Sequence, residues 1–525
     1  MRLLANARVY TQDPGLPWAE ALVVGPSGRI VAVGATRHLE AVFGARLTHR
    51  DDLQGLTVWP GLTDAHFHLR QYAEKRLWLD CATSSRAACL ERVAQRARTT
   101  PPGTWILGHG WDQNRWPEGY GSADDLDAVA PAHPVFLTAK SLHAAWVNRA
   151  ALRAAGLSPT AADPPNGHFG RDARGRLNGL LFEGAIAWVQ RAIPRPGPVE
   201  VAAALRAAQA DLWRLGLTGV HNFDRAVSFD ALQRLRREGA LGLRVAQYLP
   251  WRAGNALAGL AYRAGWPDPW LRVVGLKGFA DGALGPRTAA MLAPYDDAGT
   301  RGTLLLTAEQ VAARGVQVAP WGWALAVHAI GDAANRAVLR GLARLRAWER
   351  AQGIPPARHR IEHAQRVAAA DIALFGRLRL VASMQPVHAL SDMRMAQQAW
   401  GARCATAYAW RALRQAGAVL AFGSDAPVES PDPWLGLYAA VTRRQPDGTP
   451  RAGWYPQQRL RLAEALAAYT TGPAWAAGWE RFLGRLAPGY AADLLVLPHD
   501  PFTLPPEALL ETRPVRVMVN GRWVV

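Results

Sequence analysis

The sequence contains very little lysine. Of its 60 lysine and arginine residues, only Lys75, Lys140 and Lys277 are lysine. Lys277 stands at the end of the apolar run VVGLKGF, where a buried charge is costly. An amine kept there, in a chain that otherwise uses arginine, indicates a role that a guanidinium cannot fill.

Cysteine is equally scarce, with three residues, and long apolar runs are missing. Cys81, Cys89 and Cys404 form no CxxC pattern, which argues against a disulfide framework and a thiolate zinc site. The sequence has no run of about 18 uncharged apolar residues, so we expect no membrane span. The start MRLLANARVYTQD has no sustained apolar stretch and no small-residue cleavage site. We therefore expect a cytoplasmic protein.

Acidic residues are outnumbered by lysine and arginine, which gives the chain a formal net charge of +18. This excess raises an alternative of another class, a nucleic-acid-binding protein. The arginines are spread along helix-like segments such as ALRAAQADLWRLG and do not gather with aromatic residues. Dispersed charge usually forms a solvated face, so we predict neither a nucleic-acid nor a membrane partner. Binding to random duplex DNA with a steep salt dependence would support the alternative.

The middle of the chain alternates apolar runs with Ala/Leu/Arg segments long enough for crossover helices. Eight runs are present: LTVWPGLTDAHFHL, LGLTGVHNF, LGLRVAQYL, LRVVGLKGFAD, WALAVHAIGD, HRIEHAQ, RLVASMQPVH and AVLAFGSDAPV. Continuous apolar strands with intervening helices predict a parallel sheet covered on both faces. Eight such units predict an α/β fold of the (β/α)8 TIM barrel type.

Both chain ends consist of short runs of strand-forming residues separated by glycine and proline, a pattern typical of β-strands. We predict that residues 1–56 and 485–525 form one composite β-sandwich around a barrel of residues 57–484. About 150 residues separate the first two apolar runs, far more than one crossover needs. We interpret 78–205 as an insertion that begins after the first barrel strand and covers the active-site face.

Six side chains able to bind a metal stand where apolar runs end. His66 and His68 lie two apart, so a strand directs both to one face. The other four residues end later runs, and they are Lys277, His328, His363 and Asp425. Nitrogen and oxygen donors without thiolate suit Zn²⁺, with Mn²⁺, Fe²⁺ or Ni²⁺ as alternatives. Lys277 could bridge two metals if its amine formed a carbamate with carbon dioxide; the alternative is a lysine paired with Asp281.

The order of these motifs resembles the metal-dependent amidohydrolase superfamily. The motifs are DAHFHL, LKGFADGALGPRTAAM, VHAIGDAANR, HRIEHAQ, SMQPVH and GSDAPVESPDPWLGLYAAVTR. More narrowly, they resemble its family 3 branch, which includes N-substituted formamide deformylase-like proteins. Segments near both ends, AEALVVGPSGRIVAVGA and GRLAPGYAADLLVL, agree with the family's sandwich. The resemblance covers essentially the whole chain.

This resemblance implies a role for each candidate ligand. His66 and His68 would bind the more buried metal, His328 and His363 the more exposed one, and carbamylated Lys277 would bridge the two. Asp425 would be both a ligand and the general acid–base. The implied reaction is hydrolysis of a non-peptide C–N bond, an amide or N-formyl amine, by metal-activated water. A single metal held by His66, His68, His328 and Asp425, supporting deamination of a ring amine, is the alternative.

Substrate contacts are predicted in two further segments. The insertion motif GHGWDQNRW offers Trp111 and Gln113 as pocket residues, and His143 is a further candidate, although Trp111 could equally be core. Ser141 and Leu142 stand where relatives often carry an acidic residue and glycine. Arg287 is predicted either to hold the substrate's carbonyl or carboxylate or to pair with Asp281. We expect a small-molecule amide as the partner, and we keep a homodimer as an option.

Three other polar residues near the expected site receive weaker predictions. His221 and His388 follow the second and seventh strands, and we expect each to support the ligands or the fold. Strand alternation turns Glu362 away from His363, so the pattern predicts no catalytic role for it. A protein of this fold that has lost activity is a third reading, but the presence of every expected ligand argues against it.

Overall fold

Eight parallel strands form the central sheet of the protein, whose computed structural model describes residues 1–141, 143–164, 166–260, 263–265 and 268–525. They are β8 (Leu62–Phe67), β15 (Leu217–Asn222), β16 (Arg244–Pro250), β17 (Leu271–Phe279), β18 (Ala324–Ala329), β19 (Arg360–His363), β20 (Val381–Met384) and β21 (Val419–Phe422). The strands pair in this order from β8 to β21, and a bridge from Phe67 to Ala426 joins the first strand to the segment after the last. The predicted α/β barrel is confirmed as a nearly closed eight-stranded sheet.

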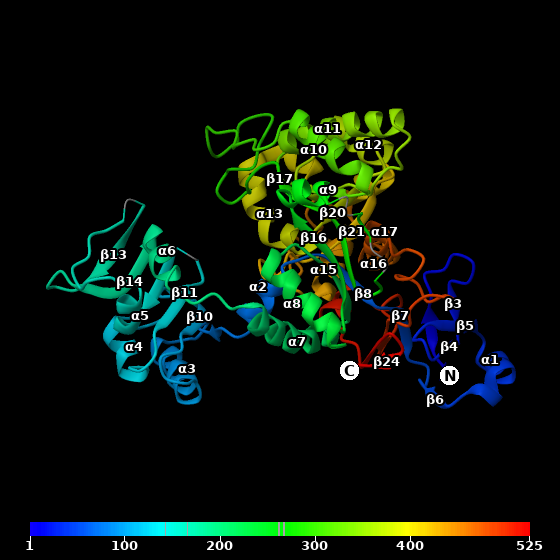
Figure 1. Cartoon of the computed structure of the whole chain (residues 1–525), viewed down its shortest axis with the longest axis horizontal. Coiled ribbons are helices and arrows are strands. Elements are labelled where there is room, and N and C mark those ends of the chain that lie inside the picture. Colours follow the sequence, from blue (N-terminus) through cyan, green and yellow to red (C-terminus); the bar gives the residue numbers. More distant parts are fainter. Residues whose placement is uncertain (142, 165, 261–262, 266–267) are drawn as a thin grey trace. The chain divides into compact units, whose positions relative to one another are not determined.

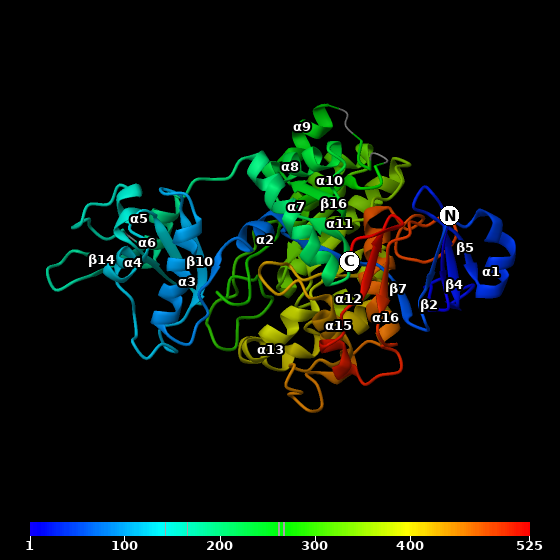
Figure 2. The same cartoon turned by 90° about the horizontal axis from the view of Figure 1, so that it is seen from below.

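Helices follow most of the barrel strands and cover the sheet (Figures 1 and 2). They are α2 (Leu69–Lys75), α7 (Pro198–Arg214), α8 (Ala226–Arg237), α9 (Ala253–Gly259), α10 (Ala308–Val318), α11 (Asp332–Ala351), α12 (Ala369–Arg377), α13 (Pro386–Trp400), α14 (Trp410–Gln415), α15 (Pro433–Thr442), α16 (Leu462–Tyr469) and α17 (Thr471–Ala477). Every residue of β15 is buried, as expected for a strand covered on both faces. None of the helices in the described ranges combines the length and apolar character needed to cross a membrane.

The two chain ends build a pair of sheets. One contains β5 (Ile30–Gly34), β4 (Ala21–Val24), β1 (Arg2–Ala5) and β6 (His49–Asp52), with α1 (Thr36–Phe43) nearby. The other contains β24 (Arg522–Trp523), β23 (Arg516–Val519), β22 (Leu494–Leu497), β7 (Thr57–Pro60), β2 (Arg8–Tyr10) and β3 (Trp18–Ala19). Leu4, Leu22, Val58 and Val496 share one core between the sheets. The predicted composite sandwich is therefore confirmed, although β7 lies in residues that the prediction gave to the barrel; blue β7 and the red C-terminal strands lie together in Figure 2.

The insertion after β8 is a compact unit of its own, Ala73–Ala204, and the rest of the chain forms the other unit. Its mixed sheet contains β13 (Gly167–Arg171), β14 (Leu177–Glu183), β12 (Ala144–Val147), β11 (Val135–Ala139), β10 (Ile106–Trp111) and β9 (Leu79–Asp80). Its helices are α3 (Arg86–Thr99), α4 (Ala123–Val129), α5 (Arg149–Ala154) and α6 (Gly184–Gln190). Buried Trp111, Trp116 and Trp146 belong to one core of this unit, which explains its tryptophan-rich sequence.

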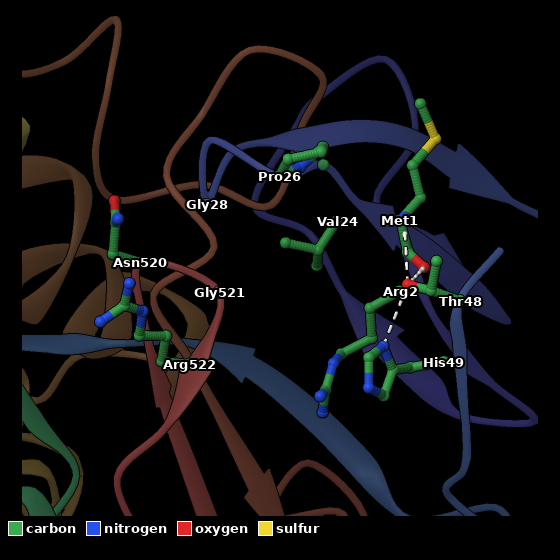
Figure 3. A pocket seen from close by; sticks show the side chains of 11 residues that line it. Met1, Arg2, Val24, Pro26, Gly28, Thr48, His49, Asn520, Gly521 and Arg522 are labelled. Carbon is green, nitrogen blue, oxygen red and sulfur yellow. Dashed lines mark hydrogen bonds between the residues drawn. The ribbon is translucent and has the colours of Figure 1, made fainter. Parts of the chain in front are cut away.

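A surface pocket of about 390 Å³ lies in the sandwich, where the two chain ends meet (Figure 3). Its lining includes Arg2, His49 and Arg522. Arg2 is already paired with Asp51 at 2.9 Å. The candidate ligands named above do not line this pocket, so we assign it no part in catalysis.

A buried ion pair connects the barrel to the sandwich. Arg244, at the start of β16, donates from Nε and Nη2 to the two carboxylate oxygens of Asp493, at 2.8 and 3.0 Å. Both side chains are almost fully buried, and the guanidinium also packs 3.9 Å from the ring centre of Trp270. This geometry is the bidentate one in which arginine and a carboxylate interact most strongly.

Replacing Asp493 with alanine should lower the free energy of unfolding by about 3–5 kcal/mol, because it leaves the buried guanidinium of Arg244 without a counter-charge. Denaturant titration followed by circular dichroism measures the change. Glu40→Ala is the matched control, since its partner Arg50 is at a similar distance, 2.9 Å, but in solvent. An equal shift of the denaturation midpoint in both variants would contradict the role assigned to the buried pair.

Candidate metal centre

Three of the predicted ligands meet closely at the carboxyl ends of the barrel strands. The ligand atoms of His66, His363 and Asp425 all lie within 4.8 Å of one another, and the three side chains are buried. They come from β8, from the last residue of β19 and from the segment after β21. This spacing is compact enough for one cation to contact all three residues.

The other three predicted ligands surround this group. His68 Nε2 lies 3.2 Å from Asp425 Oδ1, and Lys277 Nζ lies 3.4 Å from His66 Nε2. The imidazole of His328 lies 4.6 Å from that of His363, measured between ring centres. Residues spread over 360 positions of sequence therefore meet at one mouth of the barrel, because the strand ends of a barrel share one face.

Two of these residues depart from ordinary backbone geometry. His363 and Asp425 have φ angles of +72° and +61°, in the left-handed region that non-glycine residues rarely adopt. The surroundings hold Asp425 in place, since its backbone N–H donates to the His66 carbonyl at 2.8 Å. Asp64 holds Ser424, the residue before Asp425, by accepting a hydrogen bond from its hydroxyl at 2.6 Å. Such backbone conformations concentrate at functional sites.

The hydrogen bonds of three imidazoles leave their other ring nitrogen available. His66 Nδ1 lies 2.6 Å from Glu362, His363 Nδ1 lies 2.8 Å from the Gln385 side-chain oxygen, and His328 Nε2 lies 2.8 Å from the Gly282 carbonyl. An oxygen that only accepts requires the ring nitrogen beside it to carry the proton. The opposite nitrogen is then the unprotonated one, as in histidines that bind metals.

Burial keeps the same imidazoles neutral. Burial and the nearby Lys277 ammonium lower the pKa of His66 to about 3 and that of His328 to about 4. Burial, with the neighbouring imidazoles, holds the pKa of His363 well below its ordinary value. A metal binds neutral imidazole, so these three residues need not release a proton to act as ligands.

His68 and Asp425 carry the opposite electrostatic signature. Burial opposes the charge on each, but Asp224 and Asp425 raise the pKa of His68 to about 9. The surrounding imidazoles, with His66 first, hold the pKa of Asp425 well below its ordinary value. This part of the site therefore attracts positive charge, and a divalent cation can supply that charge in place of the proton on His68.

Lys277 is buried, with 7% of its surface exposed, and it has no carboxylate partner among the described ion pairs. Its Nζ lies 4.7 Å from the ring centre of Phe223 and 5.1 Å from that of Phe279. Burial lowers its pKa to about 8. The alternative pairing with Asp281 is wrong, because that carboxylate accepts from the backbone N–H groups of Ile330, Gly331 and Ala290 instead.

The donor set fits a divalent metal. Asp425 Oδ1 and His68 Nδ1 are buried and make no hydrogen bond of normal geometry in the parts of the chain that the structure describes, although each has an oppositely charged neighbour, His68 Nε2 at 3.2 Å and Asp224 Oδ1 at 3.5 Å respectively. Buried polar atoms that make no such hydrogen bond are unusual, and a bound ion is one explanation for them. Imidazole and carboxylate donors without thiolate are compatible with Zn²⁺ and with other first-row divalent metals.

The four predicted substrate residues belong to two units of the chain: Arg287 to the unit that contains the barrel, and the other three to the inserted unit. Arg287 pairs with Asp297, with Nε 3.0 Å from Oδ1, so the predicted pairing with Asp281 is wrong. Trp111, Gln113 and His143 belong to the inserted unit. Trp111 is core, and its Nε1 donates to the Leu137 carbonyl at 2.8 Å. Exposed His143 contacts Glu183 at 3.0 Å, and Leu142 lies outside the described residues.

Two acidic residues of the site escape prediction from the sequence. Asp224 follows β15 and lies 3.5 Å from His68 Nδ1, so the rule that located the other strand-end residues also applies to it. Glu362 lies on the same face of β19 as Arg360 and contacts His66 at 2.6 Å, whereas the positive φ at His363 ends the regular alternation of the strand. The other two residues with weaker predictions also lie near the site: His221 contacts Arg360 at 2.7 Å, and His388 Nε2 lies 4.0 Å from Asp425 Oδ2.

Comparisons with known proteins agree with one another. Residues 52–525 match the model of the amidohydrolase family. The chain is 34% identical to YtcJ of Bacillus subtilis (strain 168), covering 98% of both chains. It is 28% identical to N-substituted formamide deformylase of Arthrobacter pascens, covering 99% of this chain and 97% of that one. A crystal structure of an uncharacterized metal-dependent hydrolase from Pyrococcus furiosus is 27% identical, with a TM-score of 0.80, covering 95% of this chain and 99% of that one.

Proposed function

The chain belongs to the amidohydrolase family and is a metal-dependent hydrolase, and from this premise we propose that it hydrolyses a non-peptide C–N bond of a small amide or N-formyl amine. The observation that carries the proposal is the meeting of His66, His363 and Asp425 within 4.8 Å at the barrel mouth. The similarity to an N-substituted formamide deformylase supports the choice of bond.

We assign the metal ligands from the chain's own contacts. His66, His68, His328, His363 and Asp425 would hold two divalent ions, with zinc as the first choice. Lys277, as its carbamate, would bridge them, and its lack of a carboxylate partner among the described ion pairs supports this role. When bound, the metals would activate water and polarise the substrate carbonyl.

Asp425 would move the proton. The surrounding imidazoles hold its pKa well below the ordinary value, its Oδ1 lies 3.2 Å from His68 Nε2, and its backbone N–H is held by the His66 carbonyl at 2.8 Å. A base held in this way can take a proton from the attacking water and deliver it to the departing nitrogen. The bond between carbonyl carbon and nitrogen then breaks, and the products are a carboxylic acid and a free amine.

The site offers an apolar surface for one substituent of the substrate. Phe279, the last residue of β17, is 54% exposed, and its ring centre lies 5.3 Å from that of His328. Leu305, whose N–H donates to the Ala280 carbonyl at 2.7 Å, is also 54% exposed. Exposed apolar side chains beside polar ligands are typical of small-molecule sites. We therefore propose an amide with an aromatic or bulky apolar substituent.

Phe279→Ser should lower kcat/KM about 2- to 10-fold for N-benzylformamide, the range expected when one aromatic contact is lost. The same change should leave kcat/KM for N-methylformamide nearly constant, because that substrate has no ring to pack. Steady-state kinetics on both substrates measures the difference. Equal losses on both would remove Phe279 from substrate recognition.

The experiment that tests the proposed function is a substrate screen with zinc- and manganese-loaded protein. N-formyl, N-acyl and cyclic amides are the substrates, and released amine is measured directly. Amine released together with one equivalent of acid supports hydrolysis of the C–N bond. Ammonia released from an aromatic ring amine, with one metal per chain, would favour the deaminase alternative.

A further inference from the structure

A buried charged pair lies directly beneath the candidate metal centre. Arg360 and Glu362 are both 0% exposed, and both belong to β19. Arg360 Nε lies 2.5 Å from Glu362 Oε1, and its Nη2 lies 3.1 Å from Oε2. The guanidinium is also held by the Tyr248 hydroxyl at 3.0 Å, His221 Nδ1 at 2.7 Å, the Ser383 hydroxyl at 2.6 Å and the Ala65 carbonyl at 2.6 Å.

The pair continues into a candidate ligand. Glu362 Oε2, the oxygen that accepts from Nη2, lies 2.6 Å from His66 Nδ1. A flat face of the same imidazole is restrained as well. The rings of His66 and Phe223 stack, with their centres 4.1 Å apart and their planes 16° apart. Arg360 also holds the carbonyl of Ala65, the residue next to His66. These contacts restrain both the position and the rotation of the His66 imidazole, and the Glu362 carboxylate favours a proton on its Nδ1.

Stability alone does not account for such an arrangement. Well-packed apolar residues usually stabilise a barrel interior as well as a buried ion pair does, because removing two charges from water is costly. Two neighbouring candidate ligands use neutral partners, since His363 contacts the Gln385 amide and His328 a backbone carbonyl, while His68 Nδ1 lies 3.5 Å from the Asp224 carboxylate. A full negative charge behind an imidazole increases the electron density at its opposite nitrogen and strengthens it as a ligand.

We propose that Arg360 and Glu362 are positioning residues of the metal centre: the guanidinium orients the carboxylate, and the carboxylate fixes His66 as the tautomer whose Nε2 binds metal. The inference rests on the proposed function, since it assigns a role toward the metal. It assigns a role to two residues of the HRIEHAQ motif that are not themselves candidate ligands, and it predicts that metal affinity depends on two side chains that touch no metal.

Metal affinity is the first test, because it needs no substrate. Glu362→Gln and Glu362→Ala should weaken zinc binding about 10- to 100-fold in a chelator competition. The visible absorption of the cobalt-loaded protein should change in both variants, since the orientation of His66 changes. The control is Glu349→Gln, which removes a charge from another buried cluster, where Glu349 contacts Arg346 at 2.7 Å and His359 at 3.3 Å.

The control separates a role at the metal from a general effect of removing a buried charge. Glu349→Gln should bind zinc within about twofold of the wild-type protein, the scatter between independent sites. The proposal would be overturned if both Glu362 variants had the same zinc affinity and the same cobalt absorption as Glu349→Gln. A wild-type protein that binds no divalent metal would overturn the proposal and the proposed function together.

A double variant distinguishes positioning from stability. Arg360→Met combined with Glu362→Gln removes both charges, so it should recover thermal stability relative to Glu362→Ala without recovering zinc affinity. Recovery of both would mean that the pair acts through stability alone, and would overturn the proposal.

A measurement on the wild-type protein keeps the proposal testable if every variant fails to fold. In zinc-loaded protein with ¹⁵N-labelled histidine rings, the imidazole of His66 should show a protonated Nδ1 and a metal-bound Nε2. Coupling of that Nδ1 to a ¹³C-labelled glutamate carboxylate distinguishes His66 from His363, whose Nδ1 contacts the Gln385 side chain. A protonated Nε2 on His66 would overturn the proposal.

Discussion

Replacing Lys277 with alanine is expected to lower kcat/KM by at least about 100-fold and to release one of two bound metal equivalents. The size follows from the several kcal/mol that a metal contributes to the transition state of hydrolysis. Burial lowers the pKa of Lys277 to about 8, so more of its amine is neutral near pH 7.5 than in an ordinary lysine. The neutral amine can attack carbon dioxide, forming an N–C bond and losing a proton, to give an anionic carbamate.

Lys277→Arg separates the need for a carbamate from the need for a positive charge, because arginine keeps a cation but cannot form the carbamate. It should be as inactive as the alanine variant, whereas short carboxylic acids should partly restore the alanine variant alone. Metal analysis, kinetics and the ¹³C signal of protein supplied with labelled bicarbonate provide the readouts. Lys140→Ala changes an exposed lysine and should change none of them. Full activity of the arginine variant would refute the carbamate.

Asp425→Asn is expected to lower kcat about 10²- to 10⁴-fold, the range for loss of a positioned general acid–base. The amide keeps the size of the side chain and one oxygen donor, so much of the metal should remain bound. Its oxygen cannot accept the proton of water near neutral pH. Kinetics together with metal analysis of the same sample separates lost proton transfer from lost metal.

Asp371→Asn is the matched control for this change. Asp371 is also a buried carboxylate, but it pairs with Arg336 at 2.8 Å on the outer helices. Its kcat should stay near the wild-type value. A wild-type rate in Asp425→Asn would remove Asp425 from the proton path, and a metal-free variant would show that its main role is that of a ligand.

The barrel strands and the sandwich are predictable from the sequence because their signals are local. Each apolar run corresponds to one barrel strand, since a strand covered on both faces needs apolar side chains throughout. His66 and His68 stand out for the same reason, as polar residues at the end of such a run. Asp224, which is not among the predicted residues, follows the same rule, because it stands directly after the second apolar run.

Contacts between distant segments are harder to predict. Arg287 has acidic residues on both sides of it in the sequence, and only the folded loop shows that Asp297 is the partner. Glu362 contacts His66 across 296 positions of sequence, and the left-handed backbone at His363 that allows both side chains to reach the site has no marker in the residue type. Such pairings depend on where a strand ends, which periodicity determines poorly.

The central claim is that the strand-end residues form a metal-dependent site that hydrolyses a C–N bond. The most direct measurement is product analysis with an N-formyl amine before chelation, after chelation and after zinc is restored. We predict equal amounts of formate and free amine, a loss of both products on chelation and their return with zinc. Amine release that continues undiminished in the chelated protein would contradict the claim.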